Sequence, residues 1–464
     1  MKVRKVCFLA VLFALVLFVF AFGFYRLPKI SQAVELQGNR ESYKMDAMMV
    51  AEKGNVYLAS GEKVLSQDTP VAEGTLDAAL GNLFGCGDPL TNAGKISDTL
   101  MGSCFTYTSG SLRQDKSGSF SGYDVYLTID GKMQTSIYNI LSGTRGQAVL
   151  INYKTGEILA LVSQGKGMKL SECFDMSAYE LDENGKVKYN EKTANSVTGT
   201  RIYPGSTLKP IVAAALFEEG EGEMLESFRY SCTSAREYIA EGYSLECYMG
   251  SAHGEIGLEE ALTDSCNKFL PYYVYTQGVN PESLVKRLSS FGIDGVNEQA
   301  DINQVKSTLC CNMENSFNYM FIGQGDTKMT LLSLATPYMA LADGGTVAEP
   351  HYIAAYGEIG DAEHKVALAT QEHSMMQQET VQTITKSLKK TVSKGTASGI
   401  GSEVDVFFKL SAKTGTADYT QEGTHKLCIT YSGNEDYPYV LAVDIPESEG
   451  RAVDVTGEIW NSLR

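Results

Sequence analysis

The chain has 464 residues, 43% of them hydrophobic and 10% aromatic, as expected for a globular protein with a large core. Its length corresponds to roughly two to three domains. The 39 basic and 56 acidic residues give a net charge of −17, which argues against nucleic acid as a partner because phosphate binding requires basic patches. The sequence has no Gly-rich phosphate loop and no His-x-x-His cluster, and its five histidines are scattered, so we expect no metal site and no cofactor.

The N-terminal segment predicts a membrane anchor. Val6–Phe24 is a run without a charged residue, and as a helix it would rise about 28 Å, close to the roughly 30 Å hydrocarbon core of a bilayer. Three basic residues precede the run, which favours a cytoplasmic tail at residues 1–5 and an extracytoplasmic location for the rest. The alternative is a cleaved signal peptide, but the run is longer than the usual apolar core of about 7 to 15 residues.

Beyond the anchor, the sequence divides into a small membrane-proximal module and a larger domain. Residues 25–108 show weak periodicity with several glycines, and Ser109–Gly122 has the Ser- and Gly-rich composition of a linker. In residues 123–464, strand-like segments lie at both ends and helical segments lie between them, which predicts one α+β domain whose sheet joins its two ends. The strand-like segments are 123–130, 146–164, 408–418, 426–433 and 437–447, and helical ones include 131–141, 258–270 and 329–345.

Residues 201–221 contain a serine and a lysine that a helix would place side by side. Pro204 and Gly205 break the preceding structure, and then Ser206 and Lys209 begin a wholly apolar helical run. Residues i and i+3 of a helix are neighbours, and a serine becomes a good nucleophile only beside a base. The spacing alone is weak, since it occurs at Ser60, Ser163, Ser206, Ser265, Ser283 and Ser387. Only Ser206 leads into a helix apolar enough to be buried and to hold a reactive group rigidly.

Two further motifs each have competing copies. Ser265–Asn267 lies at a predicted helix boundary, where Ser and Asn are also common caps, and Ser-x-Asn recurs at Ser316 and Ser432. Lys-Thr-Gly occurs twice, and Lys154–Gly156 is explained as a turn between two strands. Lys413–Thr416 instead follows a strand-like segment and has glycine inside it, which often marks close approach of a ligand or another backbone. The second copy is therefore the functional candidate.

The cysteines leave the redox state open. Nine of the ten follow the predicted anchor, an odd number, so at least one is unpaired. Cys232 and Cys247 bracket a polar segment and form the best disulfide candidate, which would stabilise the fold by about 3 kcal/mol. Reduced and partly buried thiols explain the same pair equally well.

Taken together, Ser206-x-x-Lys209, Ser265-x-Asn267 and Lys413-Thr-Gly-Thr416 resemble the motif set of class A β-lactamases and penicillin-binding proteins. The wider sequence resembles the class B penicillin-binding proteins, the D,D-transpeptidases of peptidoglycan synthesis, in their shorter Gram-positive type. The resemblance covers residues 123–445 through YDVYLTIDGKMQ, GQAVLINYKTGEILALVS, YPGSTLKP, HGEIGLEEALTDSCNKF, GQGDTKMTLLSLATPYMALADGGTVAEPH and KTGTAD. It weakens before residue 123, where only Glu52–Gln67 is similar and Lys53 stands where the family has arginine.

The resemblance implies a penicillin-binding transpeptidase or serine β-lactamase-like fold, with an antiparallel sheet and helices on both faces. It also implies that Ser206 attacks the penultimate D-Ala carbonyl of a peptidoglycan stem peptide. Lys209 would then be the base, and Ser265 would relay the proton to the departing amine. A lysine acts as a base only when neutral, and burial and a nearby cation both lower a lysine pKa.

The remaining motif residues would bind the substrate. In the family reading Asn267 holds the peptide, Lys413 orders Ser265, and Thr414 and Thr416 bind the substrate carboxylate, with Gly415 in the same segment. The backbone N–H groups of Ser206 and Thr416 would hold the oxyanion. The implied partners are stem peptides, β-lactam antibiotics, the membrane through the N-terminal helix, and a separate glycosyltransferase.

Two other enzyme classes use similar motifs. A class A β-lactamase activates water with a glutamate, and no Glu-x-x-Leu-Asn segment lies between Asn267 and Lys413. A class D enzyme has Tyr-Gly-Asn where this chain has Ser265-Cys-Asn. A β-lactam sensor would need a cytoplasmic transducer, which a five-residue tail does not supply. A D,D-carboxypeptidase differs only in its acceptor, so it remains the nearer alternative.

Overall fold

The computed structural model describes residues 54–66, 69–84, 124–164, 169–170, 195–240, 243–294, 304–309, 317–419, 423–446 and 450–464. The chain separates into two units, residues 1–54 with 98–123, and residues 55–97 with 124–464, and nearly all described residues belong to the second. The predicted anchor Val6–Phe24 and the predicted linker Ser109–Gly122 lie outside the described residues. In the part of the chain that is described, no helix is both long and apolar enough to cross a membrane.

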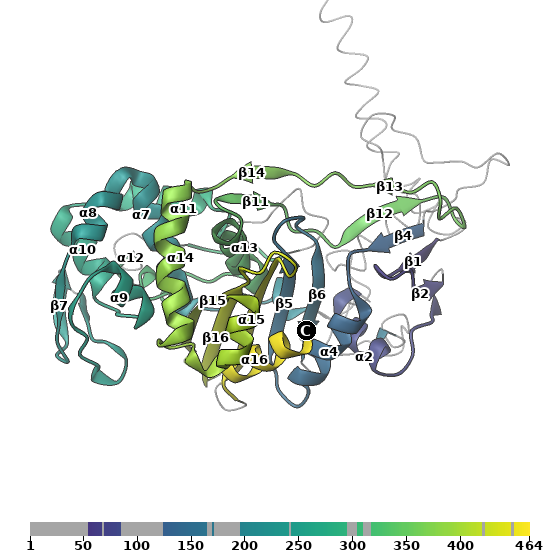
Figure 1. Ribbon diagram of the computed structural model, residues 1–464, viewed down its shortest axis with the longest axis horizontal. Helices are drawn as coiled ribbons and strands as arrows, with labels where there is room; N and C mark the ends of the chain where they lie inside the picture. Colours follow the sequence, from purple (N-terminus) through teal and green to yellow (C-terminus); the bar gives the residue numbers. More distant parts are fainter. Residues whose placement is uncertain are drawn as a thin grey trace, which may run out of the picture. The chain divides into compact units, whose positions relative to one another are not determined.

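A five-stranded antiparallel sheet forms the centre of the second unit (Figure 1). Its order is β15 (Ser411–Tyr419), β16 (Gly423–Tyr431), β17 (Tyr439–Pro446), β5 (Gln147–Asn152) and β6 (Ile158–Ser163). Strand β17 pairs with β5, so that Val440 lies opposite Ile151 and Val443 opposite Ala148. The prediction that the sheet joins the two ends of the domain is therefore confirmed.

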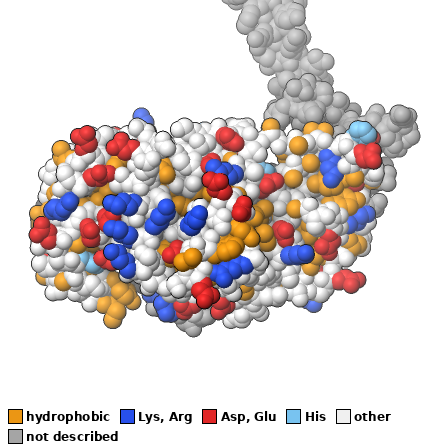
Figure 2. All heavy atoms as spheres, viewed as in Figure 1, with side chains coloured by type: hydrophobic (Ala, Val, Ile, Leu, Met, Phe, Trp, Pro, Cys, Tyr) orange, Lys and Arg blue, Asp and Glu red, His pale blue; other side chains and the backbone are white. Residues whose placement is uncertain are grey.

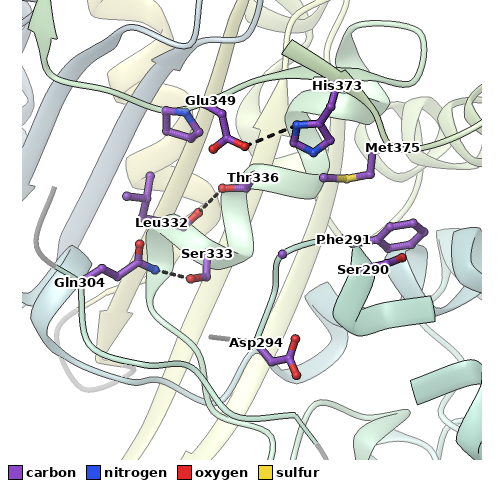
Figure 3. A pocket seen from close by; sticks show the side chains of 12 residues that line it. Ser290, Phe291, Asp294, Gln304, Leu332, Ser333, Thr336, Glu349, His373 and Met375 are labelled. Atoms are coloured by element: carbon purple, nitrogen blue, oxygen red, sulfur yellow. Dashed lines mark hydrogen bonds and ion pairs between the residues drawn. The ribbon is translucent and has the colours of Figure 1, made fainter. Parts of the chain in front are cut away.

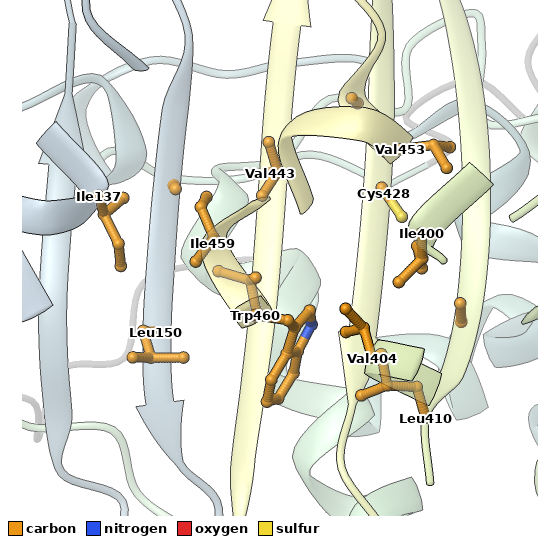
Figure 4. Packing of buried hydrophobic residues seen from close by; sticks show 14 of the residues in the cluster. Ile137, Leu150, Ile400, Val404, Leu410, Cys428, Val443, Val453, Ile459 and Trp460 are labelled. Atoms are coloured by element: carbon orange, nitrogen blue, oxygen red, sulfur yellow. The ribbon is translucent and has the colours of Figure 1, made fainter. Parts of the chain in front are cut away.

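Helices cover both faces of this sheet, which explains why β5 and β17 read as continuous apolar runs rather than alternating ones. Helices α4 (Gly131–Leu141), α15 (Ser402–Phe408) and α16 (Ala452–Ser462) pack on one face, and α13 (Leu331–Ala342) packs on the other. The fully buried Trp460 of α16 lies at the centre of the first layer (Figure 4), and its indole Nε1 donates to Thr430 Oγ1 at 2.7 Å. Truncation of such a side chain to alanine typically costs about 3–5 kcal/mol.

A second, six-stranded sheet includes residues from the predicted membrane-proximal module. Its order is β13 (Val366–Ala367), β12 (Ile353–Gly357), β4 (Asp124–Leu127), β1 (Asn55–Tyr57), β2 (Lys63–Ser66) and β3 (Thr69–Pro70). Strand β1 pairs in parallel with β4, and Asn55 donates from its backbone and its side chain to the buried Asp124, both at 2.7 Å. A boundary at residues 109–122 therefore does not separate Asn55–Tyr57 from the main unit. Composition along the chain could not reveal this, because the partner strand is distant in sequence.

Helix α14 (Gln378–Ser393) supports the region that carries Ser265. Ile384 and Leu388 are fully buried, whereas the Lys386 side chain is 72% exposed. Figure 2 shows Lys and Arg side chains over this helix, interspersed with acidic ones. Lys386 Nζ lies 3.0 Å from Glu259 of α9 (Leu258–Thr263), and Lys390 pairs with the same carboxylate. These contacts tie α14 to the helix that precedes Ser265.

The other described elements surround the two sheets. The helices are α2 (Gly74–Phe84), α6 (Ser196–Gly199), η2 (Gly205–Leu208), α7 (Lys209–Leu216), η3 (Phe217–Glu221), α8 (Gly222–Ser227), η4 (Tyr248–Gly250), α10 (Phe269–Gln277), α11 (Pro281–Ser290), α12 (Phe317–Met320) and η5 (Ser398–Ile400). The strands are β7 (Tyr230–Cys232), β8 (Glu237–Ala240), β9 (Tyr243–Leu245), β10 (Gly254–Ile256), β11 (Thr346–Ala348) and β14 (Glu372–Ser374).

Candidate active site

Ser206 lies in a 3₁₀ turn that is held tightly against the central sheet. Gly205 has φ of +55°, and a Cβ there would lie 2.5 Å from Thr416 O, so only glycine allows this approach of η2 to β15. The hydroxyl of the buried Tyr338 donates to Thr207 O at 2.5 Å from the other side. In a 3₁₀ helix, residues i and i+3 are eclipsed, so Ser206 and Lys209 stand one above the other. The turn from Ser206 to Lys209 is therefore a 3₁₀ turn, tighter than the α-helix that the sequence predicted.

Lys209 is the first residue of α7, a helix that is buried on all sides as its sequence predicted. Its Nζ donates to Ser265 O and to Asn267 Oδ1, both at 2.7 Å, and lies 3.4 Å from Ser265 Oγ. Among the hydrogen bonds of the described residues, none joins Lys209 to Ser206 Oγ. Burial lowers the pKa of Lys209 to about 8, so its neutral form becomes accessible near neutral pH.

Ser265 occupies a strained position at the end of α9. Its φ is +60°, in the left-handed region that residues other than glycine seldom adopt. The backbone N–H of Cys266 donates to Ala261 O at 2.9 Å, a hydrogen bond that closes the helix end around this conformation. As a result Ser265 Oγ accepts from Lys413 Nζ at 2.9 Å and lies between the two buried lysines.

Lys413 and the residues after it lie on β15, an edge strand of the central sheet. The Lys413 side chain is fully buried, and burial together with the nearby charge of Lys209 lowers its pKa well below the usual lysine value. A Cβ at Gly415 would lie 2.9 Å from Thr207 Cγ2 and 3.0 Å from Pro204 O. The glycine therefore permits close approach of another backbone, as the sequence pattern indicated.

A cavity of about 720 Å³ brings the sequence-predicted residues together. Ser206, Ser265, Asn267, Thr414, Gly415 and Thr416 all line it. Lys209 and Lys413 reach it through their contacts with Ser265. The predicted catalytic and substrate-binding side chains thus converge on one cavity.

Other lining residues were not predicted. Lys426 Nζ lies 3.3 Å from Thr416 Oγ1, and the hydroxyls of Thr396 and Thr414 lie 2.5 Å apart. Lys426 is the cross-strand partner of Thr416, so the hairpin register between β15 and β16 was the signal that could have found it. Tyr248, Tyr319 and Arg451 also line the cavity, and no local motif marks them.

The competing copies lie elsewhere in the fold. Lys154 is in the turn between β5 and β6, and its 56% exposed side chain pairs with Asp343. Ser163 Oγ contacts Ser196 Oγ at 2.6 Å, and Ser283 contacts Glu219. Ser432 caps the turn after β16 by accepting from Asn434 N at 3.0 Å. These residues do not line the cavity, whereas Ser316 lies outside the described residues.

A second hollow of about 210 Å³ lies beside α11 and α13 (Figure 3). His373 Nδ1 lies 3.4 Å from Glu349 Oε1 at its edge, and Gln304 and Ser333 hydrogen-bond each other. None of the predicted site residues lines it. Its polar groups are mostly engaged with one another, so we assign it no chemistry.

Several known proteins resemble this chain in sequence over much of its length. The family model of the penicillin-binding protein transpeptidase domain matches residues 146–463. Penicillin-binding protein 3 of Bacillus subtilis (strain 168) is 30% identical over 306 residues, covering 64% of this chain and 43% of that protein. Peptidoglycan D,D-transpeptidase MrdA of Escherichia coli (strain K12) is 23% identical over 262 residues, covering 52% of this chain and 39% of that protein. The chain thus spans less than half the length of these curated relatives.

Solved structures share the fold. Penicillin-binding protein A from M. tuberculosis, as an imipenem acyl-enzyme complex, matches with a TM-score of 0.71 and 17% identity over 90% of this chain and 99% of that one. The D,D-transpeptidase domain of a peptidoglycan glycosyltransferase from Eggerthella lenta matches with a TM-score of 0.70 and 18% identity, covering 89% and 98%. The two curated relatives come from B. subtilis and E. coli, so the Gram-positive type stays a prediction. The chain belongs to the penicillin-binding protein transpeptidase family, as a class B member.

Proposed function

We propose that this protein is a peptidoglycan D,D-transpeptidase that works through an acyl-enzyme on Ser206. The observation that carries the proposal is the sharing of Ser265 Oγ by two buried lysines, Lys209 and Lys413, in the cavity that Ser206 lines. A nucleophile, a base with a lowered pKa and a proton relay are the groups that acyl transfer requires.

In the acylation step, Ser206 Oγ forms a bond to the carbonyl carbon of the penultimate D-Ala of a stem peptide. Neutral Lys209 takes the hydroxyl proton, and the C–N bond to the terminal D-Ala breaks. Ser265 passes its proton to that departing amine and receives in its place the proton that Lys209 took from Ser206, across the 3.4 Å between Lys209 Nζ and Ser265 Oγ. Lys413 orients the Ser265 hydroxyl through its 2.9 Å hydrogen bond. Two ammonium groups beside one hydroxyl repel each other, which favours a neutral lysine in this cluster.

Substrate binding falls to the edge of β15 and to Asn267. Thr414 and Thr416 lie two residues apart and therefore on the same side of the strand, where their hydroxyls would bind the terminal carboxylate, with Lys426 supplying positive charge. The backbone N–H groups of Ser206 and Thr416 would hold the oxyanion. One such donor typically contributes about 3 kcal/mol to transition-state stabilisation.

The second half of the reaction depends on the acceptor. In a transpeptidase the amine of a second stem peptide attacks the acyl-enzyme and forms the cross-link. A D,D-carboxypeptidase would use water, and a β-lactamase would need a group that activates water. Asp264 is the one carboxylate among the described lining residues of the cavity, and Asp264→Asn therefore tests whether hydrolysis has a base here.

We also propose that the protein is a single-pass membrane protein with a cytoplasmic N-terminus and an extracytoplasmic catalytic domain. The support is the charge-free run Val6–Phe24 behind three basic residues. A separate glycosyltransferase would supply the glycan strands whose stem peptides this enzyme joins.

The deciding experiment is mass spectrometry of the full-length protein after exposure to penicillin, followed over time. We expect one adduct on Ser206 that persists for many minutes, and no adduct on Ser206→Ala. With a pentapeptide donor and an amine acceptor, the native protein should then release D-Ala and form the joined peptide. Release of the penicillin adduct within seconds would support a β-lactamase instead, and D-Ala release without any joined peptide would support a carboxypeptidase.

A further inference from the structure

Three cysteines and one histidine form a compact cluster beside the cavity, and the histidine, His253, also lines the cavity. The sulfur atoms of Cys232, Cys247 and Cys266 lie 3.7 Å from one another in all three pairs, and Cys232 Sγ lies 3.2 Å from His253 Nδ1. The three thiols are at most 2% exposed, and the histidine is half-buried. The four side chains together offer four ligand atoms within 4.8 Å of one another.

The fold assembles this cluster from four separate segments. Cys232 ends β7, where it pairs with Gly254 of β10, and this pairing places His253 beside it. Cys247 directly precedes η4, and Cys266 lies between α9 and α10. No two of the ligands are close enough in sequence to form a local metal motif, which is why the sequence predicted no metal site.

The distances fit a single tetrahedral metal ion rather than a disulfide. Thiolates bound about 2.3 Å from one zinc ion lie about 3.8 Å apart at tetrahedral angles, which matches the 3.7 Å of all three sulfur pairs. A disulfide needs about 2.05 Å between two sulfurs and would leave the third thiol without a role. The pair Cys232 and Cys247, a disulfide candidate by sequence, is not bonded in the structure.

Groups around the cluster are suited to bound thiolates. The backbone of Asn267 hydrogen-bonds to the Cys247 sulfur, and the backbone of Lys268 hydrogen-bonds to the Cys266 sulfur. Such outer contacts orient metal ligands and stabilise their charge. The buried Lys268 ammonium lies close by and is itself held by Glu237 at 2.8 Å.

We propose that Cys232, Cys247, Cys266 and His253 bind one structural Zn²⁺ ion. Three thiolates and one imidazole complete a closed tetrahedral shell, the usual form of a structural zinc site, and leave no position for substrate.

Because of the position of Cys266, the zinc ion would also hold part of the active site in place. Cys266 is the middle residue of the Ser265–Asn267 motif, so the metal would fix the turn that presents Ser265 Oγ and Asn267 Oδ1 to Lys209. Ser265 has a φ of +60°, a strained conformation that persists only when its surroundings enforce it. Zinc bound to Cys266 would supply that constraint. The cysteines are positioning residues in this scheme, since they do not touch the substrate.

Metal content tests the site directly. The full-length protein, purified with a phosphine reductant and without chelator, should carry one zinc per chain by mass spectrometry of its elements. Cys266→Ser should lose it, whereas Cys428→Ser should keep it, because Cys428 is a buried cysteine of β16 outside the cluster. If a cysteine variant fails to fold, His253→Gln tests the site instead, because His253 is only half-buried. This variant should also lose zinc. Native protein that binds no Zn²⁺ after reconstitution under reducing conditions, or that contains a Cys232–Cys247 disulfide instead, would overturn the site.

Acylation after metal removal tests the positioning role. Stripping zinc with a chelator should slow penicillin acylation of Ser206 by up to about 10²-fold, the cost of a misplacement of about 1 Å at a catalytic group. Added Zn²⁺ should restore the rate, and Co²⁺ should restore it with the visible absorption of a tetrahedral thiolate site. Stripped protein that acylates at the native rate would overturn the positioning role. The zinc content is measured without any substrate. A failure of the zinc site is therefore distinguishable from a failure of the proposed transpeptidase function.

Discussion

The two Lys-Thr-Gly segments have the same three residues in opposite environments. Lys154 lies in an exposed hairpin turn, where its hydrogen bond to Asp343 raises its pKa. Lys413 is fully buried on an edge strand, where burial and the charge of Lys209 lower its pKa. A tripeptide therefore carries no chemistry by itself. What gives Lys413 a role is a low-dielectric site with a second lysine and a serine hydroxyl at 2.9 Å.

The largest loss of acylation is expected at Lys209, the second buried lysine, and it tests whether burial turns a lysine into a base. Lys209→Arg keeps the positive charge but cannot deprotonate in a protein, so a base role should fail. We expect penicillin acylation to fall by about 10² to 10⁴, the usual contribution of general base catalysis. The melting temperature should stay within a few degrees, measured by calorimetry. A folded variant that acylates within tenfold of the native protein would leave Lys209 as a positioning charge.

The direct comparison of the two copies should give the next largest effect. Lys413→Ala removes a donor to Ser265 Oγ, and we expect acylation to slow by roughly 10² to 10³, as for loss of a donor that stabilises the transition state. Lys154→Ala and Ser163→Ala are the matched controls and should acylate at nearly the native rate. Equal damage from Lys154→Ala would show that the wrong copy has been assigned.

Substitution of the glycine in each Lys-Thr-Gly copy should have a different effect: the change at Gly415 should slow acylation, and the change at Gly156 should lower folding stability. Alanine at Gly415 would press on Thr207 and Pro204 and displace η2 from β15, so acylation should slow by up to about 10²-fold. Alanine at Gly156, where φ is +77° and a Cβ would lie 2.3 Å from Glu349 O, should cost roughly 1–3 kcal/mol of folding free energy. Denaturant unfolding and stopped-flow acylation of both variants measure the two effects. If a stably folded Gly156→Ala variant acylated slowly, the first Lys-Thr-Gly copy would also affect activity, and this prediction would be wrong.

The smallest expected effect is a pH dependence. Because burial lowers the pKa of Lys209 to about 8, its neutral fraction rises with pH, and acylation should increase about tenfold between pH 7 and pH 9. Lys154→Met should leave this profile unchanged. A rate that is flat over this range would mean that the group acting as base titrates elsewhere.

The sequence by itself determined the fold class and the identity of the motif residues. Apolar runs placed β5, β6 and β17, because strands of a sheet covered on both faces are mostly apolar along their length. The apolar run after Lys209 predicted a buried helix, and the glycine at 415 predicted a close backbone approach. These features depend on local periodicity or local sterics, which a sequence carries directly.

Only the tertiary structure decided what depends on segments far apart in the chain. It placed Lys426 against Thr416, joined β1 to β4, and brought Cys232, Cys247 and Cys266 within 3.7 Å of one another. Burial, the lowered pKa values of the two lysines and the left-handed φ of Ser265 likewise exist only once the helices and the sheet have packed. The physical reason is that desolvation and side-chain geometry are properties of the packed neighbours, which a single sequence does not position.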